Sequence, residues 1–297
     1  MFRLFPNFAS AVVAAGILVG SGSLGAADPL ERSAAVGSER ASPGQTMNSL
    51  PGRETYFYVD TLEPHELAEL HNAGAVHVID VRSRFEYETL RIDGAHHVNV
   101  EDRDFVEQVL AIHEQNPAFP VAFYCRGESC FRAYQAAERM LSQGFQDAYS
   151  MDAGIYAWAD QHPEATAMFG SAPLDPDHLI DDQEFGDRLL APDEFASRAH
   201  SGQYRVLDLR RPFERDQIGL FLQHESNITT SESSAMSMFL SEVKDSGDPL
   251  LVYDITGGEV RLFQYVLARN EISDYYFMDG GFKNFRDTLL RDPDGGS

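Results

Sequence analysis

The feature that most constrains this sequence is an internal repeat, because its second half matches its first at an interval of 128 residues, with few breaks. Identical residues recur at this interval with the same spacing between them. They are Pro64 and Pro192, Glu66 and Glu194, Ala68 and Ala196, Gly74 and Gly202, Asp80 and Asp208, Arg82 and Arg210, Phe85 and Phe213, and Glu86 and Glu214. A period of this length corresponds to a whole domain rather than to one unit of a solenoid. The repeat therefore predicts two similar globular domains.

Each copy alternates short apolar runs with amphipathic helical stretches. The apolar runs predict strands at 76–81, 121–124, 147–151, 204–209, 250–253 and 275–278. Helical spacing of apolar residues predicts helices at 64–73, 134–141, 192–200 and 262–267. Strands that alternate with helices favour an α/β fold, here two domains that are each a parallel sheet flanked by helices. Ligands bind such sheets where strands end and helices begin.

The first residues have the pattern of an export signal. Arg3 precedes an apolar run at 8–18 and a group of small residues at 21–27. We therefore expect a signal peptide at 1–27 and a periplasmic or secreted protein, or a membrane-anchored one if the segment stays uncleaved. A flexible leader is expected at 28–55. The two domains are expected at 56–172 and 186–295, with a Pro- and Asp-rich linker at 173–185.

The charge of the chain limits the partners that it can attract. Its formal charge of −24 comes from 47 acidic against 23 basic residues. A chain this acidic repels phosphate backbones, so we expect no nucleic-acid partner. Partners are expected to be neutral, cationic or bound at a local site, and the sequence leaves the oligomeric state open.

Both cysteines of the chain lie in the loop after the strand predicted at 121–124. A thiol at a strand end, followed by loop amides and a helix N-terminus, has its thiolate stabilised by those dipoles, which favours Cys125 as a nucleophile. Arg126 and Arg132 add positive charge that favours the thiolate and an anionic sulfur donor. Gly127 permits a tight turn, whereas Glu128 repels anions. The predicted loop comprises Arg126, Gly127, Glu128, Ser129, Cys130, Phe131 and Arg132.

Several motifs together resemble the rhodanese family in its tandem arrangement, over about 56–172 and 186–295. They are Asp80-Val81-Arg82, Phe85-Glu86, Ile92-Asp93-Gly94-Ala95, the Tyr124-Cys125-Arg126 loop opening, and Asp152-Ala153-Gly154 with Trp158. The resemblance implies that Cys125 accepts a sulfane sulfur as a persulfide and passes it to a thiol or cyanide-like acceptor, or to a protein. It implies neither a metal nor an organic cofactor. Asp80 and Arg82 are expected to support the loop rather than perform chemistry.

Cys130 stands where the family usually has an arginine or a similar residue, and here the arginine comes later, at Arg132. Two readings of Cys130 stay open. It could form a disulfide with Cys125, since an exported protein meets oxidising conditions. It could instead be an independent thiol that attacks the persulfide and releases reduced sulfur. A permanent disulfide would block enzymatic sulfur transfer.

The second copy carries Asp254 where the first carries Cys125. A carboxylate cannot hold a sulfane sulfur, so we expect this second site to be inactive. Asp254 could also act as an acid or bind a cation. Three functions follow from these residues. The first is a sulfurtransferase, the second a non-catalytic binding or redox-sensing module that uses Cys125 and Cys130, and the third a phosphatase or arsenate reductase with a related loop.

Overall fold

The computed structural model describes residues 53–215, 220–221 and 225–290, which belong to one compact unit. The predicted signal peptide and nearly all of the predicted leader lie outside the described residues. Among the helices of the described ranges, none combines the length and the apolar character that a bilayer crossing requires.

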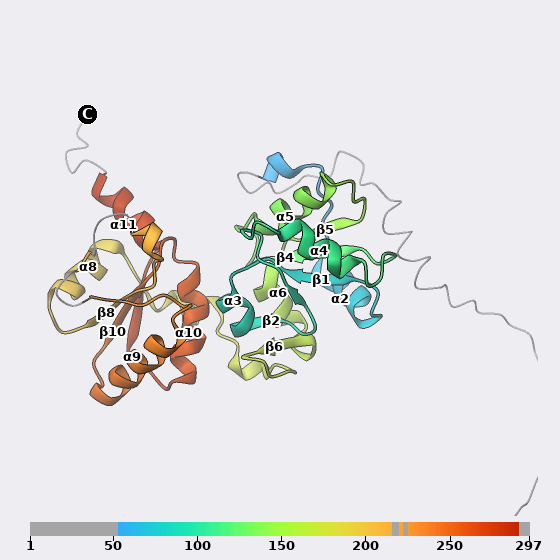
Figure 1. The fold of residues 1–297 in the computed structure, drawn as a ribbon. Coiled ribbons are helices and arrows are strands. Elements are labelled where there is room, and N and C mark those ends of the chain that lie inside the picture. The colour runs from blue at the N-terminus through green and yellow to red at the C-terminus, as the bar shows by residue number, and fades with distance from the viewer. Residues whose placement is uncertain (1–52, 216–219, 222–224, 291–297) are drawn as a thin grey trace, which may run out of the picture. The chain divides into compact units, whose positions relative to one another are not determined.

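The first half of the described chain forms a four-stranded parallel sheet in the order β3-β1-β4-β5 (Figure 1). Its strands are β1 (His77–Asp80), β3 (His96–His97), β4 (Val121–Tyr124) and β5 (Ala148–Met151). Its helices are α2 (Pro64–Asn72), α3 (Arg84–Thr89), α4 (Phe105–His113), α5 (Arg132–Leu141) and α6 (Gly154–Gln161). The α/β fold predicted from the sequence is confirmed here.

Alternate residues of β4 pack on opposite faces of this sheet, as the two-residue period of a strand requires. Ala122 and Tyr124 join a core cluster with Trp158 of α6. Val121 and Phe123 join a second cluster that includes residues of α4 and α5. Helices therefore cover both faces, which explains why the central strands read as continuous apolar runs.

The second half forms a five-stranded parallel sheet in the order β7-β11-β10-β8-β9. Its strands are β7 (Leu189–Leu190), β8 (Arg205–Asp208), β9 (Glu225–Asn227), β10 (Leu250–Tyr253) and β11 (Tyr275–Met278). Its helices are α8 (Pro192–His200), η4 (Pro212–Glu214), α9 (Ser233–Ser246), α10 (Glu259–Arg269) and α11 (Gly281–Leu290). The strands that match by the repeat occupy matching places in the two sheets.

The edge strand β7 has a smaller counterpart in the first half. Leu189, at the start of β7, pairs in parallel with Phe277 of β11. At the equivalent place, Thr61 makes a single parallel bridge to Ser150 of β5. The edge strand of the second sheet is thus reduced to one bridge in the first.

A short antiparallel pair joins β2 (Leu90–Ile92) to β6 (Thr166–Met168). The remaining short elements are η1 (Arg53–Tyr56), η2 (Pro163–Ala165), η3 (Pro176–His178) and α7 (Asp182–Gly186). The stretch expected to be a linker therefore contains η3 and most of α7. Its Leu174 and Ile180 are buried, so this segment packs onto the protein.

Helix α10 contacts the first half directly. Leu262 and Tyr265 belong to the core cluster that otherwise gathers residues from the first sheet, its helices and the segment after it. The Tyr265 hydroxyl accepts a hydrogen bond from the Ile180 backbone N–H at 3.3 Å. The ring of Phe263 lies 6.4 Å from that of Phe85 on α3, measured between centroids. One apolar core is thus built by both halves.

Candidate functional site

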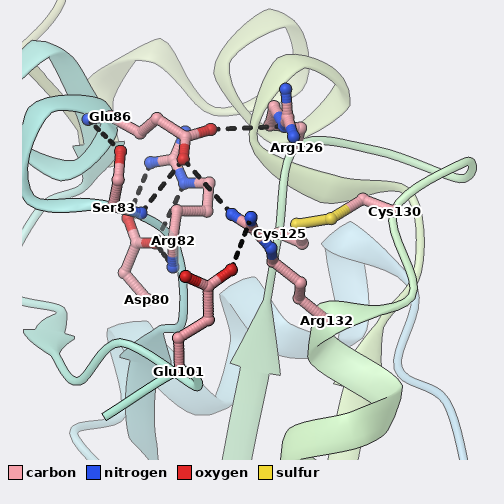
Figure 2. Close-up of a disulfide and its surroundings, with 9 residues drawn as sticks. All are labelled: Asp80, Arg82, Ser83, Glu86, Glu101, Cys125, Arg126, Cys130 and Arg132. Carbon is pink, nitrogen blue, oxygen red and sulfur yellow. Dashed lines mark hydrogen bonds and ion pairs between the residues drawn. A yellow bond between two sulfur atoms is a disulfide. The ribbon is translucent and has the colours of Figure 1, made fainter. Parts of the chain in front are cut away.

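Cys125 lies directly after β4, where the sequence placed it, but it is not a free thiol in this structure. Its sulfur is bonded to that of Cys130, with the two Cα atoms 6.1 Å apart (Figure 2). The Cys125 residue is 2% exposed and packs in the core cluster beside α4 and α5, whereas Cys130 is partly exposed. The sequence left open whether Cys130 pairs with Cys125, and in this structure the two form a disulfide.

The amides of the cysteine loop, residues 125–131, do not surround the Cys125 sulfur in this form. The Cys130 N–H donates to the Gly127 carbonyl at 2.9 Å, and the Cys125 carbonyl accepts from the Ile155 N–H at 3.0 Å. Within the described residues no backbone N–H donates to Cys125 Sγ. The expected amide cradle is therefore not formed around the sulfur while the disulfide directs it toward Cys130.

The position beside the cysteine loop that only glycine can occupy is Gly154, not Gly127. Gly127 does not have a positive φ, and a Cβ there would meet only the Ala153 carbonyl oxygen, at 3.5 Å. Gly154 has a φ of +71°, and a Cβ on it would lie 2.3 Å from the Gly127 nitrogen. The chain does turn at Gly127, whose carbonyl accepts the Cys130 N–H at 2.9 Å, but without a positive φ there. The close approach that excludes a Cβ is made at Gly154, where the start of α6 packs against the loop backbone.

The two arginines of the loop region are paired with acids. Arg126 Nε lies 3.2 Å from Glu86 Oε1, and Arg132 Nη1 lies 3.7 Å from Glu86 Oε2 (Figure 2). Arg132 Nη2 also lies 2.9 Å from Glu101 Oε1, and Arg211 Nη1 lies 3.3 Å from Glu101 Oε2. The positive charge expected to attract an anionic donor is therefore largely compensated by carboxylates.

Glu86 links this ion-pair network to the start of α3. The Ser83 N–H donates to Glu86 Oε2 at 3.0 Å, which forms one side of a capping box. Burial acts to raise the pKa of the Glu86 carboxyl, but Arg126 and Arg82 outweigh it and hold that pKa below its usual value. Glu86 is therefore a buried carboxylate. The sequence offered one signal for it, an identical glutamate at the same place in the second copy, Glu214.

Asp80 and Arg82 form an ion pair at the end of β1. Asp80 Oδ1 accepts the Arg82 backbone N–H at 3.0 Å, and its Oδ2 lies 2.6 Å from Arg82 Nη2. The guanidinium also donates to the Leu90 carbonyl at 2.5 Å. Asp208 and Arg210 repeat the ion pair at 2.9 Å in the second half. Both pairs are fully buried, which fits a structural role.

In the second half, the backbone amides converge on Asp254. Its carboxylate accepts the N–H groups of Thr256, at 2.9 Å, of Gly257 and Glu259, and of Val260, at 3.3 Å. Burial raises the pKa of this carboxyl, although the donated amides and Arg126 oppose that shift. The anion-binding geometry that the sequence predicted for the first loop is thus found in the second, where the side chain of Asp254 fills it.

The two loops face one cleft of about 1300 Å³, lined by residues of both halves. Residues 126–132 contribute one side, and Thr256, Gly257 and Gly258 another. The loops come so close that a Cβ on Gly258 would lie 1.7 Å from Arg126 Nη1. Apolar and aromatic wall residues are Phe131, Tyr156, Leu179, Ile180, Phe185 and Tyr265.

Glu259, the first residue of α10, is a further acid near these loops that sequence reasoning missed. Burial, with smaller contributions from Asp254 and Glu86, raises the pKa of its carboxyl to about 7. The Thr230 hydroxyl donates to it at 2.7 Å. Among the residues that the structure describes, no group of three or more His, Cys, Asp or Glu residues is arranged to hold a metal ion.

Comparisons with known proteins identify a family for the first half of the chain. The Rhodanese-like domain family matches residues 63–161. Over 103 residues the chain is 32% identical to thiosulfate sulfurtransferase GlpE of Pseudomonas fluorescens, a match that covers 34% of this chain and 86% of that protein. The site and fold define a sheet protein with a cysteine loop of the rhodanese type. This chain belongs to the rhodanese-like family.

Two further similarities cover smaller parts of the other proteins. The chain is 33% identical over 95 residues to a tRNA uridine(34) hydroxylase of Cytophaga hutchinsonii and spans only 30% of its length. A solved thiosulfate sulfurtransferase of Pseudomonas aeruginosa aligns with 78% of this chain and 43% of its own, with 18% identity and a TM-score of 0.35.

Proposed function

We propose that this chain is an exported sulfurtransferase that carries a sulfane sulfur on Cys125. Its second half, which has Asp254 in place of that cysteine, is catalytically inactive. Support comes from the family, from the relative named thiosulfate sulfurtransferase and from the position of Cys125 at the end of β4. The donor is a small sulfane-sulfur compound, and the acceptor is a thiol, a cyanide-like nucleophile or a protein. The first 27 residues, read as a signal peptide, support export.

The disulfide is the observation that most restricts the mechanism. When both cysteines are reduced, the Cys125 thiolate attacks the outer sulfur of the donor, forms a new S–S bond and releases the rest of the donor with the electron pair of the broken bond. Where no external acceptor takes the sulfur, Cys130 attacks Cys125 Sγ of the persulfide and displaces hydrogen sulfide. This second step leaves the Cys125–Cys130 disulfide, so an external dithiol must reduce the protein before the next turnover.

A second function, redox sensing without sulfur transfer, is favoured by the burial of Cys125. At 2% exposure, this residue reaches a donor only if the loop rearranges after reduction. In a redox sensor, the disulfide itself would change the loop that lines the cleft, and no persulfide would form. This alternative and the sulfurtransferase differ in whether reduced protein gains sulfur.

The deciding experiment is intact mass spectrometry of reduced protein incubated with a sulfane-sulfur donor. We expect the Cys130→Ser variant to gain one sulfur atom and to keep it, because its persulfide has no neighbouring thiol to resolve it. The native protein should release sulfide and return to the disulfide. The Cys125→Ser variant is the matched control and should gain nothing. Failure of Cys130→Ser to gain sulfur from any donor would reject the sulfurtransferase in favour of the redox module.

A further inference from the structure

The charges around the cleft differ from those expected of a site for a small dianion. Three arginines line it, Arg126, Arg132 and Arg261. Each has a carboxylate partner on this chain, since Arg261 Nη2 lies 2.5 Å from Asp182 Oδ1 and the other two pair with Glu86. Because a guanidinium already paired with a carboxylate attracts an anion only weakly, these cations do not make an anion site.

Acids outnumber arginines in the lining of the cleft. Glu128, Asp160, Asp181 and Asp182 face it, and Glu128 and Asp182 are exposed to solvent. The loop amides of the second half that could receive an anion are already occupied by the Asp254 carboxylate. With the chain at a formal charge of −24, both the local and the long-range field repel a dianion.

The size and the walls of the cleft suit an organic ligand. Its volume of about 1300 Å³ exceeds the roughly 300–1,000 Å³ of common small-molecule pockets, and it is far larger than an inorganic sulfur anion requires. Phe131 and Phe185 provide apolar surface on it, and Arg261 lies over the Tyr156 ring at 4.0 Å from the ring centroid. Such walls stabilise a carbon-containing body through burial of apolar area.

We propose that the sulfur donor of this cleft is an organic persulfide with an uncharged or cationic body, in preference to the thiosulfate dianion. This inference rests on the sulfurtransferase function proposed above. In the transfer, the Cys125 thiolate attacks the outer sulfur of the persulfide. The S–S bond of the donor breaks, and its electron pair leaves with the donor thiolate, which takes up a proton from water.

With four donors, the test measures how fast reduced Cys130→Ser gains sulfur, by quenched intact mass, and how fast reduced native protein releases sulfide. Three are persulfides of similar size that differ in the charge of the body, made from cysteamine, 2-mercaptoethanol and 3-mercaptopropionate, and the fourth is thiosulfate. Each rate is divided by the rate with urea-unfolded Cys130→Ser, which presents Cys125 without the cleft. We expect the corrected rates of the cationic and uncharged persulfides to exceed that of thiosulfate about tenfold or more.

A variant that removes one negative charge tests whether electrostatic repulsion causes the slower loading of thiosulfate. Glu101→Gln removes a carboxylate partner of Arg132, and its side chain is 48% exposed, so the variant should fold. We expect it to load thiosulfate about threefold faster and the cysteamine persulfide no faster. The control is Glu242→Gln. Glu242 lies on α9, far along the chain from Glu101, and is an exposed partner of Arg205. Its loss should change neither rate.

The outcomes separate the two proposals. If persulfides and thiosulfate load at equal corrected rates, or thiosulfate loads faster, the donor assignment is overturned and the sulfurtransferase stands. If Glu101→Gln leaves the thiosulfate rate unchanged, the electrostatic cause is overturned. If no donor adds sulfur to either reduced protein, the sulfurtransferase itself is rejected and the donor assignment falls with it.

Discussion

Gly258 and Arg126 approach each other so closely that a Cβ at position 258 would lie 1.7 Å from Arg126 Nη1. The backbone of the second loop thus passes against the guanidinium of the cysteine loop. The atom in the way is the far end of a flexible side chain, so Gly258→Ala should shift Arg126 at a cost below about 1 kcal/mol in unfolding free energy. The cysteine loop would lose this contact and open more readily.

We therefore expect Gly258→Ala to be reduced by dithiothreitol about two- to fivefold faster than the native protein, with a nearly unchanged melting temperature. Gly186→Ala is the control, because a Cβ there meets nothing within 4 Å, and it should leave the reduction rate unchanged. Equal reduction rates in native protein and Gly258→Ala would mean that the contact does not restrain the loop.

Gly154→Ala should be far more damaging, because the obstacle is backbone. A Cβ would lie 2.3 Å from the Gly127 nitrogen and 2.4 Å from the Arg126 carbonyl carbon, and φ is +71°. We expect a loss above about 3 kcal/mol in unfolding free energy, measured by denaturant titration. Gly144→Ala has a φ of +92° without a neighbour within 4 Å, so it should lose only about 1 kcal/mol. Similar losses in both variants would contradict the close packing of α6 on the loop.

Asp254→Ala should destabilise the protein without removing sulfur transfer. The substitution leaves the buried N–H groups that converge on this carboxylate without their acceptor, and we expect a loss of about 2–4 kcal/mol. Because the proposed function carries the sulfur on Cys125, transfer per folded molecule should stay near the native value. The measurement pairs thermal unfolding with the sulfur-loading assay well below the melting temperature. Lost transfer in folded Asp254→Ala would give this residue a chemical role.

Glu259 should make stability depend on pH near neutrality. The folded pKa of its carboxyl is about 7, above the ordinary value of 4.5. The folded state therefore binds a proton that the unfolded chain releases, so this contribution is present below about pH 4.5 and is lost as the pH rises through 7.

Between pH 4.5 and 7, we expect the unfolding free energy to fall by on the order of 2–3 kcal/mol because of Glu259. Glu259→Gln, which stays neutral, should flatten the pH profile of the unfolding free energy between pH 5 and 8. Glu107→Gln, on the exposed side of α4, should retain the native slope. A native profile that is already flat over this interval would show that Glu259 ionises in the folded state without cost.

Local sequence patterns predicted the central strands of both sheets and helices α2, α5, α8 and α10, but not helices α3, α4, α6, α9 and α11. The apolar run at 121–124 became β4 unchanged, and the pattern at 192–200 became α8. Burial on both faces produces such runs, so they can be read without knowing the partner strands. The pair β2 and β6 escaped prediction because each has only three residues and its partner lies far away in the chain.

The position of Cys125 at the end of a strand could be predicted from the sequence, but its surroundings could not. Glu101 lies 31 residues from Arg132 and 110 from Arg211, and no local spacing encodes such a pairing. The disulfide depended on how closely the backbone brings Cys125 and Cys130 together, which the interval between them does not determine. The compensation of the arginines could not be predicted for the same reason, since the carboxylates that pair with them come from distant segments.

The sharing of one apolar core by both halves has a consequence for any attempt to shorten the chain. Leu262 and Tyr265 of α10 complete a cluster whose other members come from residues 62–180. A fragment that stopped before α10 would present that cluster to water as a bare hydrophobic face, and such faces drive self-association. The second half thus contributes to the solubility of the cysteine-bearing half as well as to its packing.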